Sequence, residues 1–521
     1  MRNTKTKKSA QNRIKKIDTD GRTCVDPSGK RRKKKNRHTF GKFLAMIQII
    51  LSVVFIGVLL MLNVLPIKYL VLIFGLLAFL DAFALVSQYT RSAHMVGKVD
   101  CIFMIILLLI GNIYLIRANS TLLSITDNDY KIDRIAIVVL KDDPAQTLQE
   151  AADYTFGAQY ISGSDKVEQA IAEASKKVGQ DLYYTTYDDV FVMAQALYNG
   201  EVDALIYNAA YNDSLVEHYP TFKEDIRELE NIEIKTKLEK KRGSKKDVTK
   251  DAFTIFISGI DTEGSIATTS RSDVNMLVTV HPRTKQVLMT SIPRDYYVQL
   301  PGISGDSYDK LTHAGLYGPE CSMDTLSQVF GVEIDYYARV NFTTLRDMVN
   351  ALGGVDIESR YEFTTVSGES FVQGMNYDVD GSSALAFARE RYNLPNGDND
   401  RVLNQQTVLK AIINKCISPA ILTGYMGIMD SLSDSFETSL SQSQISSLVR
   451  MQLNDGSAWD ILSSKVVGTG SEDYCYSSGD ALLYVMIPDY DSVNTVADFI
   501  ERIKSGEIIS EEEINAAMSN Y

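Results

Sequence analysis

The stretch FTIFISGIDTEGSIATTSRSDVNMLVTVHPRTKQVLMTSIPRD, residues 253–295, contains three strand-like segments and decides the fold of this part of the chain. Its apolar runs cover residues 253–260, 273–280 and 286–292, and only the short segment HPRTK separates the second run from the third. Adjacent strands joined by so short a turn pair antiparallel. We therefore predict a meander in which the end of the first strand, the start of the second and the end of the third share one edge of a sheet.

Four charged residues fall on that shared edge. Asp261 follows the first strand, Arg271 and Asp273 lie at the start of the second, and Arg294 follows the third. Two carboxylates and two guanidinium groups are thus predicted to converge, although no local run of sequence connects them. Mg²⁺ is typically held by one or two carboxylates together with substrate phosphates, so the two aspartates are candidate ligands of Mg²⁺ (or Mn²⁺).

A second group of arginines lies in FARERYNLPNGDNDRVLNQQ, residues 387–406. The sequence predicts a helix over 382–391, with a serine at its N-cap, and a second helix that Asp398 or Asn399 caps and that runs to about Ser418. A turn containing Pro395 and Gly397 separates the two helices.

These arginines serve one ligand only if the first helix is short. Arg389 and Arg391 are two residues apart, so they would point away from each other on a continuous helix. The helix must therefore end between them. Arg401 and Gln405 are four apart and share a face near the N-terminus of the second helix, where free N–H groups and the helix dipole favour anions.

Two interpretations of the arginines are open. Planar guanidinium groups bind phosphate in bidentate fashion, which points to a ligand with more than one phosphate. Alternatively, the arginines form salt bridges with Glu390, Asp398 and Asp400, and Asp398 is expected to orient an arginine. Salt bridges do not explain the separate pair Arg271 and Arg294, so ligand binding is favoured.

The N-terminal part of the chain predicts a membrane anchor. The 521 residues carry a formal net charge of −13, but residues 1–42 alone carry about +13. Three apolar stretches follow at 43–65, 69–87 and 99–116, each close to the roughly 20 residues that a membrane-spanning helix needs. Lys/Arg bias places the basic tail and the loop between the second and third spans in the cytoplasm, and everything after Arg117 outside the cell.

Two features of this anchor allow alternative interpretations. Asp81 and Asp100 lie in or at the edge of spans, where a carboxylate is either functional or a helix cap or water-facing group. The basic tail either binds anionic lipid or nucleic acid or only fixes the topology. It has no helix-turn-helix pattern and no interleaved aromatic residues, so specific nucleic-acid binding is not predicted.

The chain is thus predicted to contain a basic cytoplasmic tail, three membrane-spanning helices, an extracellular accessory α/β domain, an α/β catalytic domain with a mixed sheet flanked by helices, and a C-terminal tail. The respective boundaries are 1–42, 43–117, 126–245, 250–500 and 501–521. A charged stretch, 235–250, is predicted to be an exposed linker between the two α/β domains. Cys321, Cys416 and Cys475 form at most one disulfide or remain free thiols.

Several motifs, in order, resemble those of the LytR–CpsA–Psr family. They are residues 259–302, DKLTHAG at 309–315, MVNALGGVDI at 348–357, and ALAFARERYNLPNGDNDRVLNQQ at 384–406. The three spans and the intervening domain resemble the streptococcal, capsule-associated CpsA branch of that family.

This resemblance implies an enzyme of the Gram-positive-type envelope that transfers a polyprenyl-pyrophosphate-linked glycopolymer, here a capsular polysaccharide, onto the C6 hydroxyl of N-acetylmuramic acid in peptidoglycan and releases polyprenyl phosphate. It implies a metal site at Asp261 and Asp273, with either also conceivable as the base. The pyrophosphate-binding positions are Arg271, Arg294, Arg389, Arg391, Arg401 and Gln405, with Lys310 in a family motif and Asp398 at an acidic position. Asn404 stands where many members have arginine, which would remove one positive charge from the rim of the site.

Two rival functions remain. In one, the chain is a membrane-anchored regulator of capsule synthesis whose basic tail binds DNA or a cytoplasmic partner. In the other, residues 130–245 are a protein-interaction module that tunes the enzyme, with capsule-assembly proteins as partners.

Overall fold

The computed structural model describes residues 23–25, 31–33, 39–90, 92–126, 130–160, 164–237, 243–260, 265–418, 428, 431–432, 435–479 and 481–521. The chain divides into two compact units. The first comprises residues 1–61 and 67–115, and the second comprises residues 62–66 and 116–521. A short antiparallel pair, β1 (Thr23–Val25) and β2 (Arg31–Lys33), lies in the basic tail.

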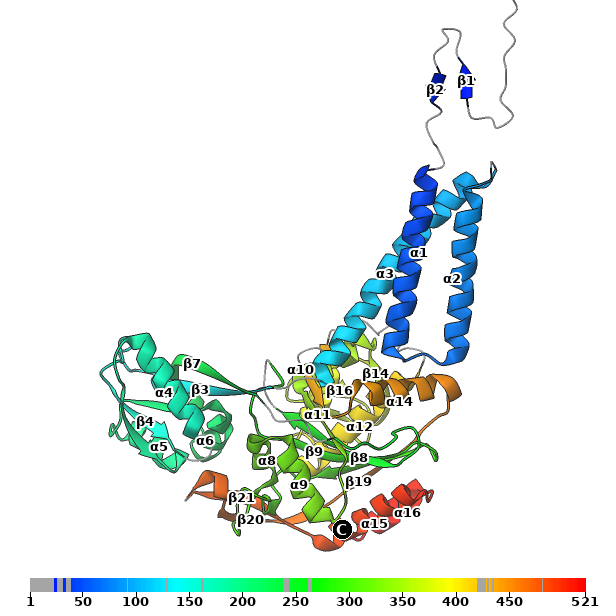
Figure 1. The fold of residues 1–521 in the computed structure, drawn as a ribbon. Coiled ribbons are helices and arrows are strands. Elements are labelled where there is room, and N and C mark those ends of the chain that lie inside the picture. The colour runs from blue at the N-terminus through cyan, green and yellow to red at the C-terminus, as the bar shows by residue number, and fades with distance from the viewer. Residues whose placement is uncertain are drawn as a thin grey trace, which may run out of the picture. The chain divides into compact units, whose positions relative to one another are not determined.

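Three apolar helices form most of the first unit (Figure 1). They are α1 (Thr39–Leu62), α2 (Ile67–Ser87) and α3 (His94–Thr126), and the last residues of α3 belong to the second unit. Each is long and apolar enough to cross a membrane. Each predicted apolar stretch therefore forms a helix, which begins a few residues before the predicted start.

Asp81 lies inside α2 and links it to α1. Its Oδ1 accepts hydrogen bonds from Nε2 of Gln48 at 3.0 Å and from the hydroxyl of Ser52 at 3.2 Å. Both partners are buried. Asp81 is therefore not a helix cap, which was one of the two interpretations of this carboxylate, but an acceptor that satisfies polar groups between two apolar helices.

Residues 130–237 of the second unit form the accessory lobe, a five-stranded sheet with strand order β5-β4-β6-β3-β7. Its strands are β3 (Tyr130–Leu140), β4 (Thr155–Gln159), β5 (Tyr183–Tyr187), β6 (Ala204–Asn208) and β7 (Ile226–Lys237). Its helices are α4 (Ser164–Val178), α5 (Val190–Tyr198), η1 (Ala209–Tyr211), α6 (Asn212–His218) and α7 (Phe222–Asp225). The predicted α/β class is confirmed. The predicted linker begins too early, because residues 235–237 still pair with β3.

Residues 243–521 form the large lobe, whose sheet has the strand order β18-β13-β8-β9-β10-β19. The strands are β8 (Phe253–Ile260), β9 (Val274–His281), β10 (Gln286–Ile292), β13 (Tyr336–Asn341), β18 (Phe436–Thr438) and β19 (Asp460–Lys465). β9 pairs antiparallel with both β8 and β10, whereas β13 and β19 add in parallel. The predicted meander and mixed sheet are confirmed.

The helices of the large lobe are α8 (Leu311–Ala314), η2 (Gly315–Tyr317), α9 (Pro319–Phe330), α10 (Phe342–Ala351), α11 (Gly381–Arg389), α12 (Asp398–Ile417), α14 (Gln442–Asp455), η3 (Tyr476–Ser478), α15 (Tyr490–Ser505) and α16 (Glu511–Met518). Short strand pairs join the loops: β11 (Tyr297–Val298) with β12 (Asp309–Lys310), β14 (Val355–Ser359) with β17 (Gly374–Val379), β15 (Phe363–Thr364) with β16 (Ser370–Phe371), and β20 (Gly468–Tyr474) with β21 (Leu482–Pro488).

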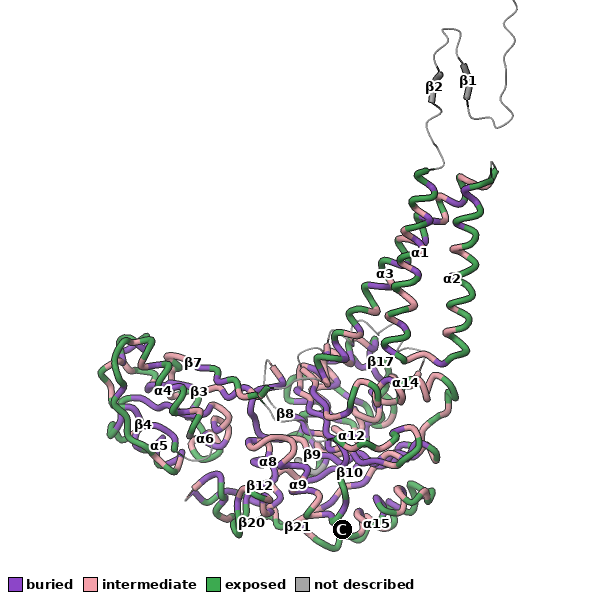
Figure 2. Tube along the Cα trace, viewed as in Figure 1, coloured by how far each residue is buried: buried purple, intermediate pink, exposed green. Residues whose placement is uncertain are grey.

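Both faces of the large sheet are covered, as Figure 2 shows by the buried residues along its central strands. Leu277 and Leu288 point to a core shared with α9, α15 and α16. Their neighbours Met276, Val287 and Met289 point to the opposite face, where residues of α12 pack. Burial on two faces explains why these strands read as nearly continuous apolar runs.

The segment 501–521, predicted to be a tail, is instead part of this core. Ile503, Ile509 and Ile514 are each fully buried there. The side chain of Gln286 on β10 donates to the carbonyl of Ile509 at 2.8 Å and accepts from its N–H at 3.2 Å. The sequence did not indicate this burial, because α16 begins with charged residues and only a few widely spaced isoleucines of the segment are buried.

The two lobes share a core and a backbone connection. Ile132 of β3 exchanges hydrogen bonds with Ala267 and Thr269, both at 2.9 Å. One apolar cluster contains residues from both lobes, including Phe191, Leu205 and Leu215 of the accessory lobe and Leu316, Leu483 and Val485 of the large lobe. The accessory lobe is therefore packed firmly against the large lobe.

Candidate functional site

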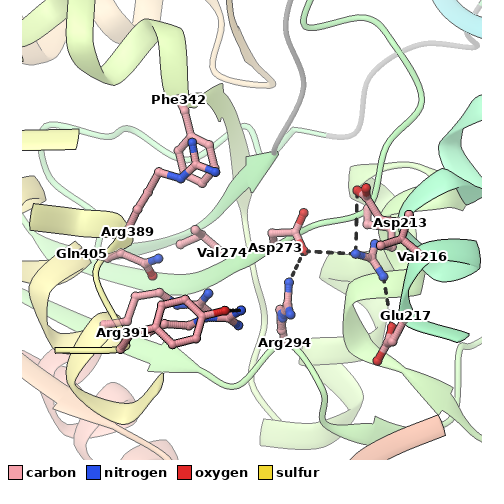
Figure 3. A pocket seen from close by; sticks show the side chains of 13 residues that line it. Asp213, Val216, Glu217, Asp273, Val274, Arg294, Phe342, Arg389, Arg391 and Gln405 are labelled. Atoms are coloured by element: carbon pink, nitrogen blue, oxygen red, sulfur yellow. Dashed lines mark hydrogen bonds and ion pairs between the residues drawn. The ribbon is translucent and has the colours of Figure 1, made fainter. Parts of the chain in front are cut away.

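A cavity of about 560 Å³ lies where β9 begins and β10 ends (Figure 3). The residues that line it are Asp213, Val216, Glu217, Arg271, Asp273, Val274, Arg294, Phe342, Arg389, Arg391, Tyr392, Arg401 and Gln405. They come from four separate parts of the chain and include five arginines and three carboxylates. The two arginine groups predicted from separate stretches of sequence therefore meet in one cavity.

The first group is organised around one carboxylate. The N–H of Asp273 donates to the carbonyl of Gly259 at 2.8 Å, so strand pairing fixes its position at the sheet edge. Its Oδ1 lies 2.8 Å from Nη1 of Arg294 and 4.0 Å from Nη2 of Arg271. Asp273 therefore orients Arg294 through a charge-assisted hydrogen bond and contacts Arg271 more loosely.

The second group depends on a helix that stops between two arginines. α11 ends at Arg389, and Glu390 after it has extended backbone angles. The buried carboxylate of Glu390 accepts hydrogen bonds from the backbone N–H groups of Arg391, Tyr392 and Asn393 at 2.8–3.0 Å. This turn confirms the predicted helix end and brings Arg389 and Arg391 into the same cavity.

Aromatic rings support these two guanidinium groups. Arg389 lies over the ring of Phe342, 4.9 Å from its centre, and Arg391 lies over the ring of Tyr392 at 4.6 Å. Figure 3 shows Arg389, Arg391 and Gln405 on the side of the cavity opposite Asp213 and Glu217. A guanidinium stacked on a ring keeps its N–H donors in its own plane, where they can contact a phosphate.

The N-terminus of α12 forms the remainder of this side. Gly397 is its N-cap, with φ +54° and ψ −117°, and makes no side-chain capping bond. Only glycine adopts that backbone conformation readily. Arg401 and Gln405 leave the helix near this end, where N–H groups favour anions. One prediction made Asp398 the N-cap of this helix. In the structure Asp398 is instead the first residue of the helix.

In the alternative interpretation of the arginines, Glu390 and Asp400 would form salt bridges with them. Glu390 is bound to backbone N–H groups, as described above. Asp400 is buried and accepts hydrogen bonds from the backbone and side chain of Asn396 at 2.9–3.3 Å. Both carboxylates therefore shape the loop between α11 and α12. The side chain of Asp398, the third candidate, lies outside the described residues.

The family model for LytR_cpsA_psr matches residues 223–488, which include every arginine of the cavity. The chain belongs to the LytR–CpsA–Psr family.

Curated relatives in this family include enzymes that act on teichoic acid. The polyisoprenyl-teichoic acid–peptidoglycan teichoic acid transferase TagU of Enterococcus faecalis is 35% identical over 195 residues, which are 37% of this chain and 63% of the relative. TagU of Bacillus mycoides is 32% identical over 240 residues, which are 46% of this chain and 75% of the relative. The match thus spans less than two thirds of the length of the Enterococcus faecalis protein.

Solved structures of similar proteins are also found. TagT bound to LI-WTA is 27% identical with a TM-score of 0.40, and the match covers 50% of this chain and 94% of that one. TagU of B. subtilis is 26% identical with a TM-score of 0.39, and the match covers 50% of this chain and 100% of that one.

Other positions of the LytR–CpsA–Psr motifs lie behind the cavity wall. Lys310, predicted to bind pyrophosphate, is fully buried and is not among the lining residues. Its Nζ lies 2.5 Å from Glu217 and 3.4 Å from Asp295. Asn404 is also buried and donates to the carbonyl of Phe387 at 3.1 Å. Position 404 therefore joins α12 to α11, and the predicted loss of charge at the rim does not apply.

In the family motif DKLTHAG, the buried carboxylate of Asp309 connects separate segments of the chain through hydrogen bonds. Asp309 accepts from Nδ1 of His313 at 2.6 Å, and its other oxygen accepts from the N–H and hydroxyl of Ser477 at 3.0 and 2.5 Å. This carboxylate ties β12 and α8 to the turn before β21.

Nearby, burial raises the pKa of the Cys475 thiol to about 12. Cys321, Cys416 and Cys475 are all free thiols, as one of the two predictions allowed.

Sequence reasoning missed part of the cavity. Asp213, Val216 and Glu217 come from the accessory lobe, and Phe342 and Tyr392 support arginines. Acidic residues at 213 and 217 on one helical face are common on exposed helices, so they gave no signal of a site. The position of Phe342 directly after β13, a parallel neighbour of β8, was the only available pointer.

The predicted metal site is described in part. Asp273 presents a carboxylate to the cavity, whereas Asp261 lies outside the described residues. Among the residues that the structure does describe, no group of three or more His, Cys, Asp or Glu side chains forms a metal-binding cluster. One carboxylate beside several guanidinium groups is nevertheless a suitable partial ligand set for Mg²⁺, which takes its remaining oxygens from phosphates and water.

Proposed function

We propose that this chain transfers a glycopolymer from a polyprenyl-pyrophosphate carrier onto a sugar hydroxyl of peptidoglycan and releases polyprenyl phosphate. The glycan proposed is a capsular polysaccharide. The observation that carries this proposal is the meeting of Arg271 and Arg294 with Arg389, Arg391 and Arg401 in one cavity. The relatives named as teichoic acid–peptidoglycan transferases support the reaction class.

The proposed chemistry is transfer at phosphorus. The peptidoglycan hydroxyl oxygen forms a bond to the sugar-side phosphorus, and the bond from that phosphorus to the bridging oxygen breaks. The electron pair leaves with the polyprenyl phosphate, and the hydroxyl proton passes to a base or to water. Arginines hold both phosphates and stabilise the charge that develops on the leaving oxygen. The N-terminus of α12 adds N–H groups on the same side.

Mg²⁺, or Mn²⁺ in its place, is proposed as the cofactor, with Asp273 and Asp261 as its ligands. When bound, the ion would neutralise part of the pyrophosphate charge. The chain's own residues then position the ligand: Asp273 orients Arg294 at 2.8 Å, and the rings of Phe342 and Tyr392 hold Arg389 and Arg391.

The proposed location is the cell membrane, with the basic tail in the cytoplasm and the accessory and large lobes outside. Two observations support it. Helices α1 to α3 are long and apolar enough to span a membrane. Lys and Arg are concentrated in the tail, and Arg91 and Lys98 lie between the second and third predicted spans. This orientation gives the cavity access to peptidoglycan and to a lipid carrier in the outer leaflet.

The test uses the full chain in detergent with a lipid-pyrophosphate glycan, Mg²⁺ and a peptidoglycan acceptor. Transfer should be detected and should fall at least about a hundredfold in Arg294→Ala and in Arg401→Ala, since each removes a charged contact to the transition state. Arg283→Ala is the matched control, because Arg283 is exposed in the turn between β9 and β10, at the other end of the strands. Absence of transfer, together with DNA binding by the basic tail, would favour the membrane-anchored regulator instead.

A further inference from the structure

Helix α6 of the accessory lobe forms one wall of the cavity. Asp213, Val216 and Glu217 line it and share one helical face because they are three and four residues apart. Figure 3 shows them across the cavity from Arg389 and Arg391. The accessory lobe therefore contributes two of the three carboxylates to a cavity whose cationic groups are all guanidinium groups.

This wall is built into the fold. Leu215 of α6 is fully buried in the apolar cluster that both lobes share, and Tyr211 before the helix packs there with Leu316. Thr269 of the large lobe donates from its hydroxyl to Asp133 of β3 at 2.6 Å, next to the backbone pairing of Ile132. Helix α6 is thus packed into the core that both lobes share.

Glu217 carries a negative charge at this wall, which contacts to Lys310 and Arg271 stabilise. Its carboxylate lies 2.5 Å from Nζ of Lys310 and 3.5 Å from Nη1 of Arg271. Burial alone would raise the pKa of Glu217, but Lys310 and Arg271 together outweigh burial and lower that pKa. Asp213 has a weaker influence on the cavity, because it lies 2.8 Å from Lys223 and 3.7 Å from Arg271.

Arg271 is incompletely satisfied by these carboxylates. Its contacts to Asp213, Glu217 and Asp273 are 3.5–4.0 Å long, which exceeds normal hydrogen-bond distance. The guanidinium is buried, and its Nε has no hydrogen-bond partner in the part of the chain that the structure describes. An unmade bond to a buried charged group is costly, so Arg271 is suited to bind a phosphate oxygen beside Glu217.

We propose that Glu217, assisted by Asp213, lowers the affinity of the cavity for a pyrophosphate monoester relative to a pyrophosphate diester. This inference rests on the proposed function. A diester, such as a glycan-loaded lipid carrier, has one negative charge on each phosphate. A monoester, such as the carrier without its glycan, gains a further charge at neutral pH because the terminal phosphate has a second pKa of about 6.

The carboxylate of Glu217 acts on this difference. The arginines attract every charge of either ligand and Glu217 repels every one, so the repulsion by Glu217 is larger for the three charges of the monoester than for the two charges of the diester. The accessory lobe would thereby disfavour occupation of the site by a carrier that has no glycan to transfer. Lys310 and Asp295 lie behind the wall and anchor Glu217 in its position.

The experiment compares two ligands with the same lipid on the full chain in detergent, at pH 8 and with EDTA. The monoester is farnesyl pyrophosphate, and the diester is farnesyl-pyrophosphoryl-N-acetylglucosamine. We expect Glu217→Gln to shift the ratio of the two Kd values about tenfold towards the monoester, relative to the ratio for the wild-type protein. Glu224→Gln is the matched control: it makes the same charge change on an exposed residue of the accessory lobe that is not among the lining residues.

The outcomes separate this inference from the proposed function. If the wild-type protein binds neither ligand, the proposed function fails and this inference fails with it. If both ligands bind and Glu217→Gln leaves the Kd ratio at its wild-type value, the inference is overturned while the proposed function stands. Should Glu217→Gln unfold the protein, Asp213→Asn carries the test. It should shift the ratio less but in the same direction, and an unchanged ratio overturns the inference.

Discussion

Removal of the Arg294 guanidinium should weaken anion binding by more than one lost contact. Arg294 is the close partner of Asp273 at 2.8 Å, and Arg271 reaches the same oxygen only at 4.0 Å. In Arg294→Ala the carboxylate of Asp273, of which 11% is exposed, therefore keeps only the longer of these two contacts within the part of the chain that the structure describes. A carboxylate left with so little compensation faces the phosphates directly and repels them.

Both effects can be given a magnitude. A hydrogen bond to a charged group contributes about 1.5–3 kcal/mol. Two like charges about 5 Å apart at an effective dielectric constant near 20 repel by about 3 kcal/mol, of which solvent in an open cavity leaves about 1 kcal/mol. The sum of about 3 kcal/mol corresponds to a Kd about 150-fold weaker.

Binding of farnesyl pyrophosphate to the full chain in EDTA, measured by calorimetry, tests this estimate. The comparison is among wild type, Arg294→Ala, Asp273→Asn and the double variant. Because the double variant also removes the repelling carboxylate, we expect it to bind about fivefold more tightly than Arg294→Ala. If the double variant binds no more tightly than Arg294→Ala, Asp273 does not act on the ligand and the reasoning is refuted.

Three further results are expected. Ile509→Ala should destabilise the large lobe by about 3 kcal/mol in thermal unfolding, whereas its neighbour Ile508→Ala should change little, because Ile509 is 0% exposed and Ile508 72%. Cys475, with its pKa raised to about 12, should resist iodoacetamide at pH 8 in the native protein and react after denaturation, as mass spectrometry would reveal. The pKa of Glu217 is lower in the fold than in the unfolded chain, so its stabilising contribution is full above about pH 4.5 and is lost at lower pH. The difference in melting temperature between wild type and Glu217→Gln should therefore shrink below about pH 4.

Local sequence patterns were sufficient for the framework of the site. Three apolar runs and a short turn at 281–285 predicted the meander. The meander placed Arg271, Asp273 and Arg294 at one edge of the sheet. The two-residue spacing of Arg389 and Arg391 predicted a helix end that Glu390 provides. In each case the chemistry that fixes the structure lies within a few residues of the side chains concerned, so the sequence contains the necessary information.

Contacts between distant segments could not be predicted in this way. Behind the cavity wall, Lys310 forms an ion pair with Glu217, which lies 93 residues earlier in the sequence. The isoleucines of the predicted C-terminal tail find their partners on α9 and the central sheet. Nothing near either segment reveals these partners, because the burial that decides them arises only when the lobes have formed.

The cavity is cationic on a part of the chain that is strongly acidic, since residues 121–521 carry a net charge of about −28. Such a surface repels anions at a distance, and salt screens this repulsion over about 8 Å. Attraction by the arginines is therefore limited to ligands that already lie at the cavity mouth. Long-range electrostatic attraction therefore does not guide a soluble anion to this cavity. A lipid-linked pyrophosphate does not need steering, because its lipid confines it to the membrane. The contrast between an acidic surface and an arginine-lined cavity thus favours a membrane-bound ligand over a free phosphate, independently of any sequence motif.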